Sequence, residues 1–227
     1  MNTLAIDIGG TGIKAAILDS NGTAITKRLR QHTPRPAPPK RVIEIISSLS
    51  QKLGEFDRIS VGFPGVVRSG QVLTAHLDPA WIGFQFDTAL CEHLGKPVRV
   101  ANDADVQGLG TIRGDGVELV ITLGTGFGSS LFIDGKLVPN LQLAHQPFRN
   151  DQTYEQSLGN AALLERGAQE WNADLALVLK NLEAMFQFKS AYIGGGNAVH
   201  VTLELPDHIV VSSNINGLLG GIALWRD

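Results

Sequence analysis

The chain opens with two apolar runs that are separated by a glycine-rich turn. Leu4 to Ile8 is a short apolar run that ends at glycines, and Ile13 to Leu18 is a second such run. Short apolar runs bounded by turn residues are typical of buried strands. Because the link between the two runs is short, we predict an antiparallel hairpin.

The turn of this hairpin carries Gly9, Gly10 and Gly12, and Asp7 comes just before it. Glycines let the backbone turn sharply and let N–H groups come close to an anion. A carboxylate beside such a turn suits a divalent cation that bridges it to a phosphate. An ordinary hairpin with a turn aspartate explains this stretch equally well.

The same plan recurs between Val120 and Asp134. An apolar strand, the turn Gly124-Thr125-Gly126 and a second apolar strand repeat the first hairpin, and this turn echoes Gly10-Thr11-Gly12. Repetition of a supersecondary unit is a strong architectural signal. The repeat predicts two similar lobes, each with a glycine hairpin, that hold one polyphosphate chain between them.

Periodicity and turn residues predict the remaining elements. We expect a third strand over 23–29, helices over 42–53, 86–94, 173–186 and 216–225, and strands over 58–63, 98–101, 191–196 and 209–212. The segment 27–41 carries six Lys or Arg residues, and its prolines exclude regular structure in its middle. A solvated loop is the preferred interpretation of this segment, and a docking track for a polyanion is the alternative.

Composition narrows the class of protein. The 227 residues are 43% hydrophobic with a net charge of −3, so nothing draws the chain as a whole to nucleic acid or membrane. Cys91 is the only cysteine, which leaves no disulfide framework and no four-cysteine metal site within one chain. We see no signal peptide and no apolar run long enough to span a bilayer, and therefore expect a cytoplasmic protein.

Three glycine motifs, in this order, resemble those of a known superfamily. Asp7-Ile-Gly-Gly-Thr, Gly124-Thr-Gly-Phe-Gly and Gly194-Gly-Gly are similar to the two phosphate loops and the adenosine-side loop of the actin-like sugar kinases. Within that superfamily the chain resembles the ROK family (repressors, open reading frames, kinases), and in it the polyphosphate glucokinase branch. The resemblance runs from Leu4 to about Ala223. It implies an α/β fold with two lobes, of the actin-like ATPase (ribonuclease H-like) type.

The resemblance also implies the domains and the donor site. The N-terminal lobe would cover residues 1–105 and the C-terminal lobe residues 106–227, with the last helix packed back on the first lobe and the active site between the lobes. The donor would be ATP or polyphosphate, with Mg²⁺ oriented by Asp7 through water and without structural zinc. The residues expected to bind the donor are Asp7, Gly9, Gly10, Thr11, Lys14, Gly124, Thr125, Gly126, Gly194, Gly195 and Gly196. A surface-facing strand lysine explains Lys14 equally well.

The acceptor site is implied by a second group of residues. Asn102 and Asp103 can simply cap the helix that follows them. By resemblance, Asp103 is instead the catalytic base at the 6-hydroxyl of a hexose, glucose being the leading candidate, and Asn102 contacts the sugar. His145 matches the histidine of the family motif Glu-x-Gly-His, whereas Gln142 replaces its glutamate, which puts the identity of the sugar in question. Glu155 lies where the family places a second sugar-binding glutamate.

Two other interpretations stay open because of Gln142. The chain is then a non-catalytic ROK-type sugar-binding regulator, or a kinase for a different small metabolite. ROK repressors carry a DNA-binding domain before the sugar site, and the sequence leaves no room for one before Leu4, so no nucleic acid is expected. The expected partners are a sugar and a phosphoryl donor, and a homodimer is allowed. Trp81 lies in a polar loop, where it either stacks on a sugar face or plugs a surface groove.

Overall fold

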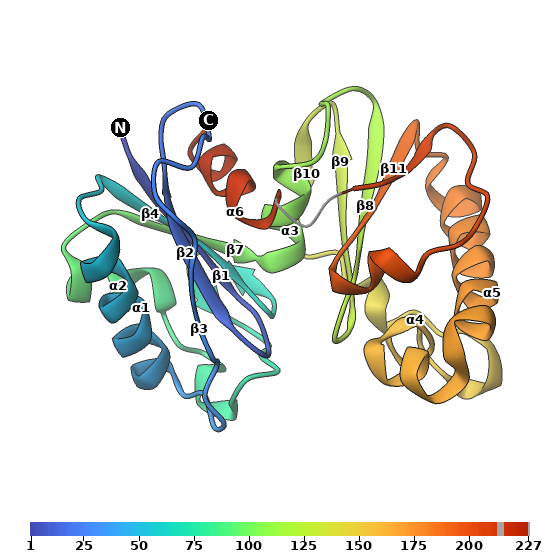
Figure 1. Cartoon of the computed structure of the whole chain (residues 1–227), viewed down its shortest axis with the longest axis horizontal. Helices are drawn as coiled ribbons and strands as arrows, with labels where there is room; N and C mark the ends of the chain where they lie inside the picture. Colours follow the sequence, from blue (N-terminus) through green and yellow to red (C-terminus); the bar gives the residue numbers. More distant parts are fainter. Residues whose placement is uncertain (213–215, 227) are drawn as a thin grey trace. The chain divides into compact units, whose positions relative to one another are not determined.

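The structure is a computed structural model that describes residues 1–212 and 216–226. The chain divides into two units: Met1–Gly110 with Ile215–Asp227, and Thr111–Asn214. Each unit is built on a five-stranded mixed sheet with helices beside it (Figure 1). The predicted α/β class is confirmed.

The sheet of unit 1 has the strand order β3-β2-β1-β4-β7. Its strands are β1 (Thr3–Ile8), β2 (Ile13–Leu18), β3 (Leu29–Gln31), β4 (Arg58–Phe63) and β7 (Val98–Asn102). β1 pairs with β2 in antiparallel register and with β4 in parallel register. The predicted hairpin is therefore present, and it forms the middle of the sheet. Two short strands, β5 (Val67–Arg68) and β6 (Gln71–Val72), form a separate ribbon.

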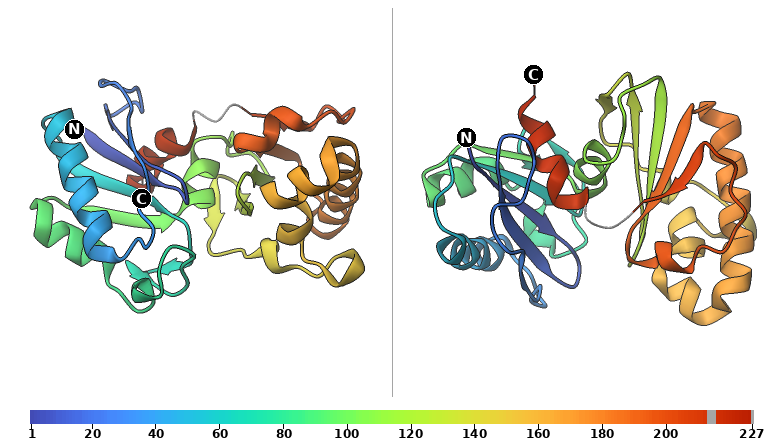
Figure 2. Two further views of the ribbon diagram at one scale, coloured as in Figure 1. Left: turned by 60° about the horizontal axis from the view of Figure 1, so that its bottom comes forward. Right: turned by 45° about the horizontal axis from the view of Figure 1, so that its top comes forward.

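Helices cover both faces of this sheet (Figures 1 and 2). On one face, α1 (Pro39–Leu53) and α2 (Phe86–Leu94) bury a core that includes Ile6, Ile46 and Val61. The opposite face meets α6 (Asn216–Leu219) and the 3₁₀ helix η5 (Gly220–Trp225) around Ala5, Ala16 and Ile222. α3 (Asp103–Leu109) packs against α6, η5 and β4. The end of the chain thus completes the unit that its beginning starts.

Several boundaries in unit 1 differ from the prediction. The helix predicted over 216–225 is the short helix α6 followed by the 3₁₀ helix η5, and β7 ends one residue later than predicted, at Asn102. The third strand lies at Leu29–Gln31 rather than over 23–29, where Ala24 alone forms an isolated bridge to Leu18. Helix α1 begins at Pro39, three residues before the predicted start at Val42. Proline is tolerated in the first turn of a helix because the N–H group at that position has no intrahelical partner.

The sheet of unit 2 has the strand order β10-β9-β8-β11-β12. Its strands are β8 (Val117–Leu123), β9 (Phe127–Ile133), β10 (Lys136–Val138), β11 (Ser190–Gly194) and β12 (Ile209–Val211). β8 and β9 form the second hairpin, and β11 lies parallel to β8. In both units an antiparallel hairpin with a third antiparallel strand is continued by two parallel strands, so the repeat seen in the sequence is a repeat of topology.

Helices of unit 2 pack on its sheet through one core. α4 (Tyr154–Leu158) and α5 (Asn160–Phe186) supply Tyr154, Trp171 and Leu175 to this core. Gly167 interrupts α5 with φ +78°, so the long helix is kinked there. Short 3₁₀ turns lie at η1 (Pro79–Trp81) in unit 1 and, in unit 2, at η2 (Leu143–His145), η3 (Arg149–Asp151) and η4 (Gly196–His200). Within the described part of the chain, no helix is long and apolar enough to cross a membrane.

Candidate active site

Asp7 lies near the end of β1, directly opposite Lys14 of β2. The Nζ atom of Lys14 is 2.8 Å from Oδ2 of Asp7, and both side chains are partly buried. Among residues 1–212 and 216–226, no three His, Cys, Asp or Glu side chains gather in a way that could hold a metal ion. A cation bound beside Asp7 would therefore take its other ligands from water and from phosphate oxygens, as Mg²⁺ commonly does.

The turn between β1 and β2 is closed by a hydrogen bond from Gly9 N to Gly12 O, 3.0 Å long. Two side chains of the segment 27–41 donate hydrogen bonds to carbonyl groups of this turn. The hydroxyl of Thr33 donates to Gly9 O at 2.6 Å, and Nη2 of Arg30 donates to Thr11 O at 3.3 Å. These contacts could not be predicted from the sequence, because a hydrogen bond from a side chain to a distant carbonyl leaves no periodic pattern.

The turn between β8 and β9 is built similarly. The N–H of Gly124 donates to Gly126 O at 3.0 Å, and the exposed Thr125 lies between them. The Gly124 carbonyl accepts from the Asn160 N–H at 2.9 Å and from Nδ2 of Asn197 at 3.1 Å. Asn160 and Asn197 were not expected from the sequence.

Two further predicted parts of the site lie against this second turn. Gly195 has φ +92°, and a Cβ atom there would be only 2.1 Å from Leu123 O, so no other residue fits. The carboxylate of Glu155 lies against Gly126, where a Cβ atom would be 2.8 Å from its Oε2. Unit 2 therefore brings together the 124–126 turn, the 194–196 loop and Glu155.

Gln142 is the N-cap of the single turn η2, and His145 is its last residue. The N–H of His145 donates to Gln142 O at 3.2 Å, and both residues are exposed. Neither side chain has a hydrogen-bond partner among the residues that the structure describes. Both side chains are therefore accessible to a small ligand.

Asn102 and Asp103 were considered both as caps of the following helix and as residues of the acceptor site. Asn102 is the N-cap of α3: its Oδ1 accepts from Ala104 N at 2.9 Å and from Asp105 N at 3.3 Å. Its Nδ2 donates to Gly65 O at 3.1 Å, which ties α3 to the segment after β4. Asn102 thus caps the helix, and the carboxylate of Asp103 also accepts from Ala104 N, at 2.9 Å.

The environment of Asp103 favours its neutral form. Residue 103 keeps some contact with solvent, but protein atoms surround its carboxyl group. Burial, followed by the negative charge of Asp7, raises the pKa of Asp103 to about 7; the N–H of Ala104 opposes the rise and the charge of Asp105 adds to it. Gly62 pairs with Asp7 across β1 and β4, and a Cβ atom there would lie 3.4 Å from Cα of Asp103. A carboxyl group with a pKa near the working pH is suited to general-base chemistry.

Trp81 does not face a sugar site. It is fully buried, its Nε1 donates to Ala37 O at 2.8 Å, and its ring lies 4.7 Å from those of Phe63 and Phe86. Of the two roles considered for Trp81, stacking on a sugar is therefore wrong. The ring plugs the core of unit 1 instead.

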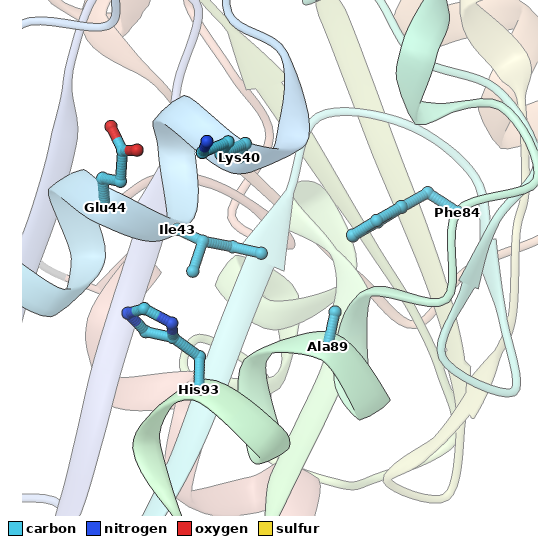
Figure 3. Close-up of a pocket in the computed structure, with 6 residues that line it drawn as sticks. All are labelled: Lys40, Ile43, Glu44, Phe84, Ala89 and His93. Carbon is cyan, nitrogen blue, oxygen red and sulfur yellow. The ribbon is translucent and has the colours of Figure 1, made fainter.

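A hollow of about 290 Å³ lies between α1 and α2 (Figure 3). It is lined by Lys40, Ile43, Glu44, Phe84, Ala89 and His93. None of the residues predicted to bind donor or acceptor lines it, and we assign it no part in the reaction.

Comparison with known proteins places this site in a family. Residues 3–141 match the ROK family. The chain belongs to the ROK family. Over 149 residues it is 38% identical to the polyphosphate glucokinase of Mycobacterium tuberculosis, a match that covers 62% of this chain and 56% of that protein. Over 147 residues it is 32% identical to the N-acetylmannosamine kinase of Escherichia coli O157:H7, covering 61% of this chain and 50% of that one. The chain thus matches about half the length of these curated ROK relatives.

The similarity to solved structures covers nearly the whole of this chain. The inorganic polyphosphate/ATP-glucomannokinase of Arthrobacter sp. strain KM superposes with a TM-score of 0.90 at 33% identity and covers 99% of both chains. A ROK family glucokinase of Streptomyces griseus, solved with glucose and AMPPNP, gives a TM-score of 0.82 at 20% identity, also over 99% of both chains. The predicted fold and family are confirmed.

Proposed function

We propose that this chain is a hexose kinase, which transfers a phosphoryl group from ATP or polyphosphate to the 6-hydroxyl of a hexose, with glucose as the leading acceptor. The observation that carries the proposal is the carboxyl group of Asp103, whose pKa of about 7 lies close to neutral pH. It stands in the same unit as Asp7 and the 9–12 turn. Names of relatives support the proposal: polyphosphate glucokinase and polyphosphate/ATP-glucomannokinase.

Asp103 would act on the acceptor. In its ionised form it accepts the proton of the attacking hydroxyl, which makes the oxygen a better nucleophile. A positioned base of this kind contributes ~10²–10⁴-fold to the rate. A pKa near 7 leaves a large ionised fraction at neutral pH and keeps the carboxylate basic enough to take the proton.

Both glycine turns would act on the donor. Phosphoryl transfer depends mainly on positioning and on stabilising negative charge. The N–H groups of Gly9 and Gly124 close the two turns, so the N–H groups that would hold phosphate oxygens are those of Gly10 and Thr11 and of Thr125 and Gly126. Lys14 and a hydrated Mg²⁺ beside Asp7 would neutralise part of the phosphate charge. The 194–196 loop, which packs on the end of β8, would lie against the nucleotide when ATP is the donor.

The residues that would bind the acceptor are Gln142, His145 and Glu155 of unit 2 and, in unit 1, Asn102 through the remaining N–H of its amide. A glutamate can accept bonds from two neighbouring sugar hydroxyls, whereas Gln142 has one acceptor oxygen and an NH₂ donor. The difference between a charge-assisted and a neutral hydrogen bond is on the order of 1 kcal/mol. Gln142 is therefore expected to weaken glucose binding or to shift the preference to another hexose.

A panel of donors and acceptors tests this function. Purified protein with Mg²⁺ is given ATP or polyphosphate together with glucose, mannose or N-acetylmannosamine, and products are followed by ³¹P NMR. We expect a sugar 6-phosphate from at least one pair. Sugar binding without any sugar phosphate would contradict the proposal and would favour the non-catalytic regulator.

A further inference from the structure

We propose that Arg30 is a further donor-binding residue, which presents its guanidinium to a phosphate group at the 9–12 turn, and that Gly12 is a glycine because this guanidinium fills the space of its side chain. This inference rests on the proposed kinase function. Of the six Lys and Arg residues in the segment 27–41, it assigns a role in donor binding to one, Arg30, whose side chain lies on the 9–12 turn.

Sheet register places Arg30 in a row of three charged residues. Asp7 pairs with Lys14 across β1 and β2, and Lys14 pairs with Arg30 across β2 and β3. Residues that lie directly opposite share one face of a sheet, and like charges opposite each other are destabilising. Asp7 forms an ion pair with Lys14. No carboxylate in the described chain pairs with Arg30, so the row carries one uncompensated positive charge.

The guanidinium of Arg30 lies on the turn itself. Its Nη2 donates to Thr11 O at 3.3 Å. A Cβ atom built on Gly12 would lie 2.5 Å from Nε and 2.9 Å from Nη2 of Arg30. Gly12 is buried, and its φ lies outside the left-handed region, so a side chain at this position would have to displace the guanidinium of Arg30 rather than strain the backbone.

Most of the hydrogen-bonding capacity of Arg30 remains for a ligand. An arginine has five N–H donors in a fixed fork that matches phosphate oxygens, and the residue is exposed. Thr33 fixes the same segment to Gly9 O at 2.6 Å, which holds the arginine in place. The other cations of the segment lack this placement: Arg41, for example, pairs with Glu44 at 3.4 Å. The ligand class is a chain of phosphates, as in a nucleoside triphosphate or in inorganic polyphosphate.

A double-mutant cycle on Arg30 and Gly12 tests the inference. Binding of ATP and of tripolyphosphate, each with Mg²⁺, is measured by calorimetry on the wild type, Arg30→Ala, Gly12→Ala and the double variant. We expect the donor Kd to rise about tenfold in Arg30→Ala, since a charged hydrogen bond to phosphate is lost. Gly12→Ala should weaken binding as well, because its methyl group displaces the guanidinium. The double variant should bind like Arg30→Ala alone.

Arg28→Ala is the matched control, because Arg28 is an exposed arginine of the same segment and makes no contact with the turn in the described chain. It should leave the donor Kd unchanged, and Arg30→Lys should restore part of the affinity. A donor Kd within twofold of wild type in Arg30→Ala, or strictly additive effects in the cycle, would overturn the inference. Arg30-dependent donor binding without any sugar phosphate would instead overturn only the kinase function.

Discussion

At the scale of single residues, the neighbours Asn102 and Asp103 show how the site keeps a carboxylate available for chemistry. Asn102 satisfies the N–H groups at the start of α3 and the carbonyl of Gly65. Asp103 is then held beside Asp7 in an environment that disfavours its charge. Placing a charge where it is disfavoured costs stability, and functional sites commonly carry that cost.

Because the ionised carboxylate of Asp103 destabilises the folded state, Asp103→Asn should raise the free energy of unfolding by an amount that depends on pH. The pKa in the folded protein is about 7 against an ordinary 3.8, so between these values the folded state holds more protons than the unfolded state. Stability of the wild type therefore falls as the pH rises from about 4 to 7. Because Asn stays neutral, the variant should be more stable at pH 8, on the order of 1 kcal/mol after allowing for partial solvent contact. The gain should vanish toward pH 4.

Thermal unfolding between pH 4 and pH 8 measures this gain. Asp207→Asn is the control: Asp207 is exposed and has no partner in the described chain, so this change should alter the melting temperature little at any pH. Equal stability of Asp103→Asn and wild type across the whole range would refute the raised pKa.

At the scale of elements, a buried ion pair network joins α4 to α5. Asp174 of α5 is fully buried and pairs with Arg149 and with Nη1 of Arg166, the latter at 2.5 Å. Nη2 of Arg166 donates to Ser157 O in α4, also at 2.5 Å. Since α4 carries Glu155, this network helps to hold the Glu155 carboxylate against the 124–126 turn.

Asp174→Ala should destabilise unit 2. Loss of the shared carboxylate leaves two arginines unpaired; because Arg149 is 45% and Arg166 23% exposed, the cost should stay below that of a fully buried pair, on the order of 2 kcal/mol. Differential scanning calorimetry should show a lower melting temperature for the transition of this unit. Glu170→Ala, an exposed change on the same helix, serves as control and should have little effect. If the two variants melt alike, the network contributes nothing to stability.

Elements with a strong local pattern were predictable from the sequence. β1, β2, β4 and α2 lie within a residue of their predicted bounds because apolar periodicity and the closing glycines mark them. β3 was misplaced because an edge strand of three residues is selected by its pairing with β2 rather than by its own sequence. The supports of the site, Thr33, Arg30 and Asn197, were missed because each binds a carbonyl that is distant along the chain.

At the scale of the whole molecule, one plan is used twice. Each unit carries a glycine turn between the two strands of its central hairpin, at Gly9–Gly12 and at Gly124–Gly126. Besides its glycine turn, unit 1 contains the proposed base, Asp103. Unit 2 contains three of the proposed sugar-binding residues, Gln142, His145 and Glu155. The C-terminal segment belongs to unit 1. There the Cζ atoms of Arg58 and Arg99 lie 4.9 Å and 4.7 Å from the ring centroid of Trp225, whose Nε1 donates to Ser60 Oγ at 2.8 Å. The chain thus begins and ends in the unit that carries the proposed base.

The turnover number of Asp103→Asn with saturating donor and hexose tests the central claim most directly. Asn102 remains as cap and the shape of the side chain is kept, so folding and hexose affinity should be retained. Without a base for the hydroxyl proton, kcat should fall by ~10²-fold or more. A kcat close to that of the wild type would contradict the account.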